Sequence, residues 1–140
     1  MSGFEVAGFI VALYPVIVDG VRTYRLAKSG QPLEWLIKEI LAEQLIFRNH
    51  LVNLLMPIVP GEALSDMLNP KSDKHTHWRD PALRSAVDEA MGVLTTTYLL
   101  TTLEDIHKEL CEIKSSLSYA TRLEEVSQGP SSRVLSNSLC

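Results

Sequence analysis

The chain has 140 residues, of which 46% are hydrophobic and 21% are charged, and its formal net charge is −4. This length suits one domain with a buried core, and the composition is that of a globular rather than a disordered protein. Because an acidic chain repels the phosphate backbone, its charge disfavours nucleic-acid binding. Most of the Gly and Pro residues stand between apolar segments of helical period, which predicts helices joined by turns.

The first segment, about residues 4–28, contains thirteen uncharged residues from Val6 to Val18. It is apolar almost all round, so we expect a helix that is buried on most sides. Pro15 lies inside this segment and predicts a kink or a break. No positive charge precedes the run, as it would in a signal peptide, and Asp19 ends it short of the roughly 20 residues that span a bilayer. We therefore expect neither a signal peptide nor a resident membrane anchor.

The clearest helix is predicted from about Pro32 to Met56, where apolar residues recur at spacings of three and four. Two prolines, Pro57 and Pro60, end it. A short helix is predicted over residues 62–68, and the polar stretch that follows, up to Arg79, reads as a loop.

Asp80 followed by Pro81 predicts the start of the next helix, with an N-cap and a proline at the first helical position. Gly92 ends or bends this helix. A long amphipathic helix is predicted from about Thr95 to Tyr119. Capping-box patterns that begin at Thr101 and Thr102, with Glu104 and Asp105 three residues later, allow it to start late. The sequence leaves open whether these two helices are continuous.

These elements predict an all-α fold, a helical bundle of about four main helices with an apolar N-terminal helix. We expect residues 1–126 to form the domain and residues 127–140, which are rich in Ser and lack periodicity, to form a disordered tail.

Few residues form a pattern that could carry chemistry. A phosphate-binding glycine loop and a nucleophile elbow are both missing from the sequence. His75 and His77, near Asp73, are metal-ligand types, but two histidines one residue apart do not close a zinc site without further ligands. The solvated-loop interpretation is favoured, and we expect no metal, no cofactor, no small-molecule substrate and no enzymatic activity.

Cys111 lies four residues after His107, which would place a thiol and an imidazole on one helix face. The neighbouring Glu112 does not stabilise a thiolate, so a structural thiol is favoured over a catalytic one. Cys140 is the last residue, and the two cysteines show no disulfide-framework spacing. We expect both thiols to be reduced.

The loop from Lys71 to Arg79 carries Lys, Arg and His side chains around Trp78. One interpretation is contact with an acidic membrane surface or partner. The favoured interpretation is a solvated loop with Trp78 packed on the bundle, because a few mixed polar residues make a weak electrostatic footprint.

Three stretches together resemble a known family. The opening MSGFEVAGFIVALYPVIVDGVRTYR is similar to the start of the fungal HeLo and HeLo-like domains, also called prion-inhibition and propagation domains. EILAEQLIFRNHLVNLL is similar to the second helix of that group, and WRDPALRSAVDEAMG precedes a long amphipathic helix in the same order. The resemblance covers about residues 1–120. Related chains are commonly longer, with a second domain, so we expect a truncated member.

The resemblance implies a helical bundle tied to fungal self/non-self recognition, of the heterokaryon-incompatibility type, and to programmed cell death. In well-known members the N-terminal helix becomes membrane-active when a signalling region is triggered. The positions here that the resemblance marks as membrane-active are Phe4, Val6, Phe9, Ile10, Val11, Leu13, Val16, Ile17 and Val18.

Two functional hypotheses of different classes remain. The first is a membrane-active module that acts on membrane lipid and is cytoplasmic, peripheral to the plasma membrane. The alternative is an interaction domain without membrane activity, whose partner is another helical protein or a second copy of the chain.

Overall fold

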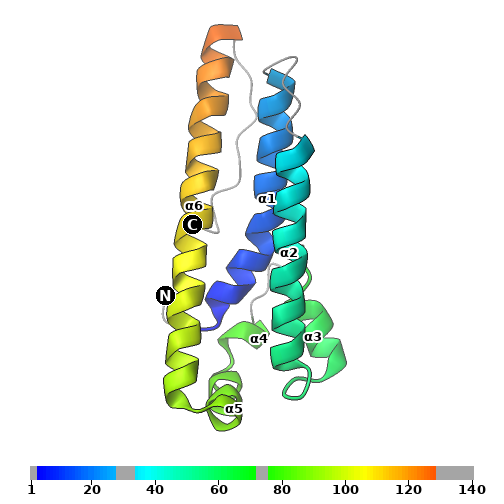
Figure 1. Cartoon of the computed structure of the whole chain (residues 1–140), viewed down its shortest axis with the longest axis vertical. Coiled ribbons are helices and arrows are strands. Elements are labelled where there is room, and N and C mark those ends of the chain that lie inside the picture. The colour runs from blue at the N-terminus through cyan, green and yellow to red at the C-terminus, as the bar shows by residue number, and fades with distance from the viewer. Residues whose placement is uncertain (1–2, 28–33, 72–75, 129–140) are drawn as a thin grey trace.

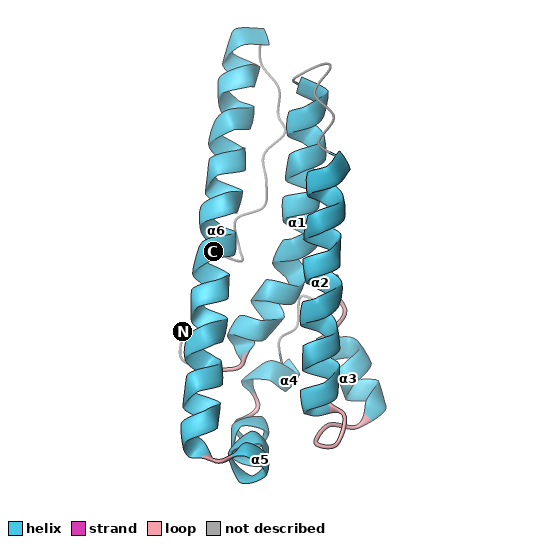
Figure 2. Cartoon of the chain, in the orientation of Figure 1, coloured by secondary structure: helices cyan, strands magenta, loops and turns pink. Residues whose placement is uncertain are grey.

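The computed structural model describes residues 3–27, 34–71 and 76–128. Over these ranges the chain forms six helices and no strand, which confirms the all-α prediction (Figures 1 and 2). Three of them are long: α1 (Glu5–Ala27), α2 (Glu34–Leu55) and α6 (Val93–Gln128). The shorter helices α3 (Gly61–Met67), α4 (Thr76–Arg79) and α5 (Pro81–Met91) gather at one end of the long ones (Figure 1).

Helix α1 is the central helix of the bundle. It packs along α6 and, less extensively, along α2, as the sequence predicted for a segment that is apolar almost all round. Ile10 and Leu13 are fully buried, and Ile17 and Val21 are 1% exposed. The hydrophobic core therefore lies along α1, with α2 and α6 as its walls.

Pro15 bends α1 without ending it. The helix runs continuously from Glu5 to Ala27 with this proline inside, and Figure 1 shows its axis changing direction between the two halves. Proline removes one backbone donor and displaces the preceding turn, which accounts for the bend. Of the two outcomes that the sequence allowed, a kink is the one observed.

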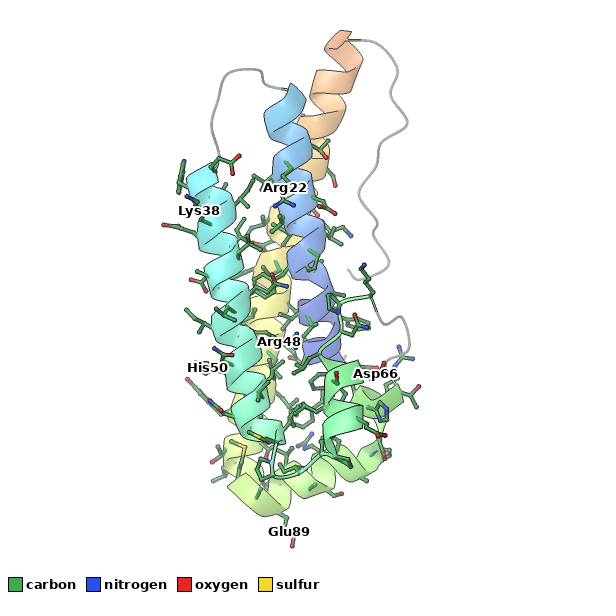
Figure 3. All side chains as sticks on the ribbon, turned by 90° about the vertical axis from the view of Figure 1, so that its right-hand side faces the viewer. Arg22, Lys38, Arg48, His50, Asp66 and Glu89 are labelled. Atoms are coloured by element: carbon green, nitrogen blue, oxygen red, sulfur yellow. The ribbon has the colours of Figure 1, made fainter. Side chains whose placement is uncertain are left out.

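The short helices α3, α4 and α5 form what we call the small end of the bundle. Two side chains that donate hydrogen bonds to backbone carbonyls at the end of α3 stabilise it. The indole of the buried Trp78 donates to the carbonyl of Met67 at 3.0 Å, and Arg48 of α2 donates to the carbonyl of Leu68 at 3.2 Å. Figure 3 shows Arg48 reaching from α2 toward this region. The prediction of a loop up to Arg79 is therefore wrong over Thr76–Arg79, which forms α4. This turn packs on the bundle because the Trp78 side chain is buried there. Its docked position agrees with the favoured interpretation of that loop.

The last two predicted helices are separate, and the break between them lies at Gly92. Asp80 caps α5 by accepting a hydrogen bond from the amide of Ala82 at 3.0 Å, as predicted. Gly92 then adopts a φ of 91°, a conformation that residues with a side chain rarely take, and separates α5 from α6. The late start that the capping boxes allowed is not observed, since Thr101 and Thr102 bond to carbonyls four residues earlier within α6.

At its far end α6 continues to Gln128, two residues into the predicted tail. The remaining part of that tail, 129–140, lies outside the described residues.

The central position of α1 makes a direct prediction about stability. Leu13→Ala, at a side chain with 0% exposure, should lower the free energy of unfolding by about 2–5 kcal/mol because it removes buried apolar surface and leaves a cavity. Leu45→Ala, at an α2 side chain that is 58% exposed, is the matched control and should cost well under half as much. Urea denaturation followed by circular dichroism measures both, and equal losses would contradict the central placement of α1.

Candidate functional site

The nine positions that the resemblance marks as membrane-active all lie on or next to α1, and most face the core. Phe4, Val6, Ile10, Val11, Leu13, Ile17 and Val18 are between 0% and 8% exposed. Phe9 and Val16 are partly exposed. In this conformation the set forms packing surface, and no open face of α1 presents it to a membrane.

Helix α1 is nonetheless long and apolar enough to cross a bilayer. The stretch Glu5–Thr23 has a mean hydropathy of 1.5, and 67% of it is buried inside the bundle. The sequence-based expectation that this segment is too short to span a bilayer considered only the thirteen uncharged residues. The whole 23-residue helix is about 35 Å long, which exceeds the roughly 30 Å thickness of the hydrocarbon layer. The core helix of a soluble protein meets the same criterion, so this length does not decide between the two roles.

One ion pair holds the N-terminal end of α1. Arg79 of α4 donates to the Glu5 carboxylate at 2.8 Å, joining residues that are 74 positions apart. The Arg79 side chain is 59% exposed, so this pair contributes at most about 1 kcal/mol. Packing rather than charge therefore holds α1 in the bundle.

The most distinctive surface is an apolar groove between α2 and α6. Both helices pack on α1 but make at most marginal contact with each other, which leaves a hollow of about 780 Å³. The floor is α1, through Tyr14, Ile17 and Val21. The α2 wall comprises Leu36, Ile40, Glu43, Ile46, Phe47, His50, Leu51 and Leu54, and the α6 wall comprises Leu99, Thr102, Leu103, Ile106, Glu109, Leu110, Ile113 and Leu117.

Each wall of this groove repeats the spacing of a coiled-coil seam. On α2 the lining positions 36, 40, 43, 47, 50 and 54 alternate steps of four and three, and on α6 the positions 99, 103, 106, 110, 113 and 117 do the same. This is the a/d pattern whose side chains interlock with a neighbouring helix. Ile46 and Ile113, one on each wall, remain 54% and 46% exposed. The groove thus has the surface chemistry of a helix–helix interface with one helix missing.

Two of the five polar side chains that line the groove are carboxylates. Glu43 lies on the α2 wall and Glu109 on the α6 wall, and His50 is also in the lining. Burial, followed by the nearby Glu43 carboxylate, raises the pKa of the Tyr14 phenol above its ordinary 10.0. The Tyr14 ring packs against Phe47 with centroids 6.1 Å apart. Glu43 therefore acts electrostatically on the groove floor.

The structure describes only one member, His77, of the metal cluster that the sequence raised as an alternative. Within the described ranges no three His, Cys, Asp or Glu side chains are placed to hold a metal ion. His77 lies 3.8 Å from Asp66, whereas the other two members of the proposed metal cluster, residues 73 and 75, fall outside those ranges.

Cys111 does lie beside His107, with Sγ 3.5 Å from Nε2, as their spacing predicted. Cys111 is disulfide-bonded, so the expected reduced thiol is wrong for this residue. A sulfur in a disulfide is not the thiolate that nucleophilic chemistry requires.

Lys114 is a buried polar residue that no sequence pattern marks. Its side chain is 4% exposed, and its amine finds no hydrogen-bond partner among the described residues. Burial lowers the pKa of this amine. Lys114 is absent from the groove lining, although it lies on the same side of α6 as the lining residues Leu110 and Leu117.

The apolar spacing that predicted the helices α2 and α6 includes most of their apolar lining residues, but that spacing does not reveal the groove. An apolar stripe shows that one face of a helix packs against another element. It does not show whether neighbouring elements cover the full width of that stripe. The seam spacing on both helices was a usable signal of an additional helix partner. Glu43 and Glu109 gave none, because each resembles an ordinary solvated carboxylate.

The environment of Tyr14 predicts a stability change at alkaline pH. Because its pKa is raised in the folded chain, the folded state keeps the proton when the unfolded state begins to lose it near pH 10. The free energy of unfolding should therefore fall as the pH rises above about 10. Tyr14→Phe should make this fall shallower, as measured by urea denaturation across a pH series. Tyr98→Phe, at a side chain that is 75% exposed, is the control, and identical slopes in the two variants would contradict the prediction.

Comparison with known proteins assigns no family to the chain. No family model matches it, and neither does any curated protein or solved structure. The resemblance to HeLo-like domains stays a prediction that rests on residues 1–25, 39–55 and 78–92.

Proposed function

We propose that the chain is a non-enzymatic helix-docking domain. In this proposal α1, α2 and α6 supply three helices of a bundle, and a helix from a partner fills the open position between α2 and α6. The observation that carries the proposal is the apolar groove of about 780 Å³ with seam spacing on both walls. An amphipathic helix laid into a hydrophobic groove is a recurring mode of peptide recognition.

The exposed apolar side chains of the groove supply the driving force for docking. Each large apolar side chain that becomes fully buried contributes about 1.5–3 kcal/mol. Ile46 and Ile113 are each about half exposed, and the lining residues Leu36, Ile40 and Ile106 are partly buried. A helix placed over these residues would bury them together, and this loss of exposed apolar surface would favour binding of a partner.

The test uses the full chain and a synthetic 18-residue helical peptide with Leu at seam positions and Gln elsewhere. Fluorescence anisotropy should detect binding that is lost in the double variant Ile46→Asp, Ile113→Asp, because aspartates in the groove would be buried without partners.

The matched control is Leu41→Asp with Leu45→Asp. These side chains are 42% and 58% exposed and absent from the groove lining, so binding should persist. Loss of binding in both double variants, or in neither, would refute docking in the groove.

A second candidate function is membrane insertion of α1, favoured by the length and hydropathy of Glu5–Thr23. The HeLo-like resemblance implies this role, with a trigger that shifts the population toward a state with α1 exposed. The chain would then act as a prion-inhibition or cell-death module, cytoplasmic and peripheral to the plasma membrane. The Glu5–Arg79 pair, whose arginine side chain is 59% exposed, is weak enough to permit such a release.

The insertion hypothesis predicts that Val16→Lys suppresses dye release from vesicles of phosphatidylcholine and phosphatidylserine. A lysine near the centre of an inserted helix costs about 2.5–3.5 kcal/mol. Val16 is partly exposed, so the folded bundle tolerates the change better than it would at the fully buried Leu13. Glu89→Lys, on α5 at the far end of the bundle (Figure 3), is the control for added positive charge. Equal dye release from wild type and Val16→Lys would exclude α1 as the inserting element.

A further inference from the structure

We infer that the helix taken by the groove is basic, with an apolar stripe flanked by Lys or Arg. This inference rests on the proposed docking function and names the chemistry of the partner. It follows from the charges that line and border the groove.

Carboxylates stand on both walls of the groove. Glu43 of α2 and Glu109 of α6 belong to the lining, and both side chains are exposed. Glu39 and Asp105, also exposed, each precede one of them by four residues and so extend the acidic edge by one helical turn. A docked helix would therefore meet negative charge on both sides of its apolar stripe.

Positive charge does not offset these carboxylates within the groove. No Lys or Arg occurs among the described residues that line it, where His50 is the remaining titratable side chain besides Tyr14. The helical period places Lys38 and Lys108 on faces turned away from the lining positions of α2 and α6. Lys114 lies on the lining side of α6, but it is buried and is not part of the lining. The local charge is thus acidic even where the helices themselves carry lysines.

The dimensions of the groove fit a helix of about five turns. The lining runs from Leu36 to Leu54 on α2 and from Leu99 to Leu117 on α6. Each wall is therefore about 27 Å long, which corresponds to roughly 18 helical residues. In such a helix, residues beside the apolar stripe lie next to the walls, where Lys or Arg can reach Glu43 on one side and Glu109 on the other.

The same charges argue against a second copy of this chain as the occupant. If α2 or α6 of another copy lay in the groove, its own flanking carboxylates would meet those of the first copy. Like charges brought together across an interface cost free energy and suppress that pairing. A basic helix meets the groove with opposite charge instead.

The test compares two 18-residue peptides with the same Leu seam, one with Lys and one with Glu at the flanking positions. For the full-length wild type, anisotropy should show the Lys peptide binding at least about tenfold more tightly than the Glu peptide, with an advantage that shrinks as salt is raised. The double variant Glu43→Lys, Glu109→Lys should lose or reverse this preference. Circular dichroism establishes that each variant remains folded.

The matched control is Glu104→Lys with Glu89→Lys, which changes the net charge equally at exposed positions outside the groove. This control should keep the preference for the Lys peptide. If it loses the preference as the groove variant does, overall charge explains the result and the inference fails.

Two further outcomes separate this inference from the docking function. Equal affinity for both peptides, with binding lost in Ile46→Asp, Ile113→Asp, would overturn the basic partner and leave docking intact. Sedimentation of the wild type as a dimer that Ile113→Asp dissociates would identify a second copy as the occupant and overturn the inference. Binding of neither peptide would overturn the docking function as well.

Discussion

The burial of α1 between α6 and α2 is the interaction on which the rest of the structure depends. Side chains such as Ile10, Leu13 and Ile17 are almost wholly removed from water, and this burial is the main source of stability in a fold without sheets in its described part. The apolar faces of α2 and α6 meet α1 and scarcely touch each other. Without α1 these two helices would have no common surface to pack on, so the domain and its first helix form one cooperative unit.

The same arrangement explains why an open groove exists. The two long helices α2 and α6 cover α1 only on the sides that they occupy. At the small end, short helices are fastened by Trp78 to Met67 and by Arg48 to Leu68, and they cover that end of the core. Between α2 and α6 the described chain supplies no further helix, and Ile46 and Ile113, one on each wall, stay about half exposed.

The two proposed functions make opposite demands on α1. Helix docking keeps α1 in place and adds a further layer over the groove whose floor is Tyr14, Ile17 and Val21, whereas membrane insertion removes α1 from the bundle. A partner seated in the groove would bind the state in which α1 is packed and so stabilise it by mass action. Docking would therefore oppose insertion, and a single groove ligand would restrain the membrane activity if the chain has both properties.

The sequence by itself determined the helical class, the approximate helix boundaries and the central role of the first segment. Those features follow from local information: apolar period, the Asp80 cap and the all-round hydrophobicity before Asp19. Only the tertiary structure decided that Gly92 separates α5 from α6, that Trp78 folds the predicted loop into α4, and that α2 and α6 stay apart. An apolar stripe indicates that a helix face packs against another element. It does not indicate how much of that face is buried, because the residues that bury it are distant in the chain. The acidic groove is a consequence of that distant geometry, in which Glu43 and Glu109 are brought to opposite walls from helices far apart in the sequence.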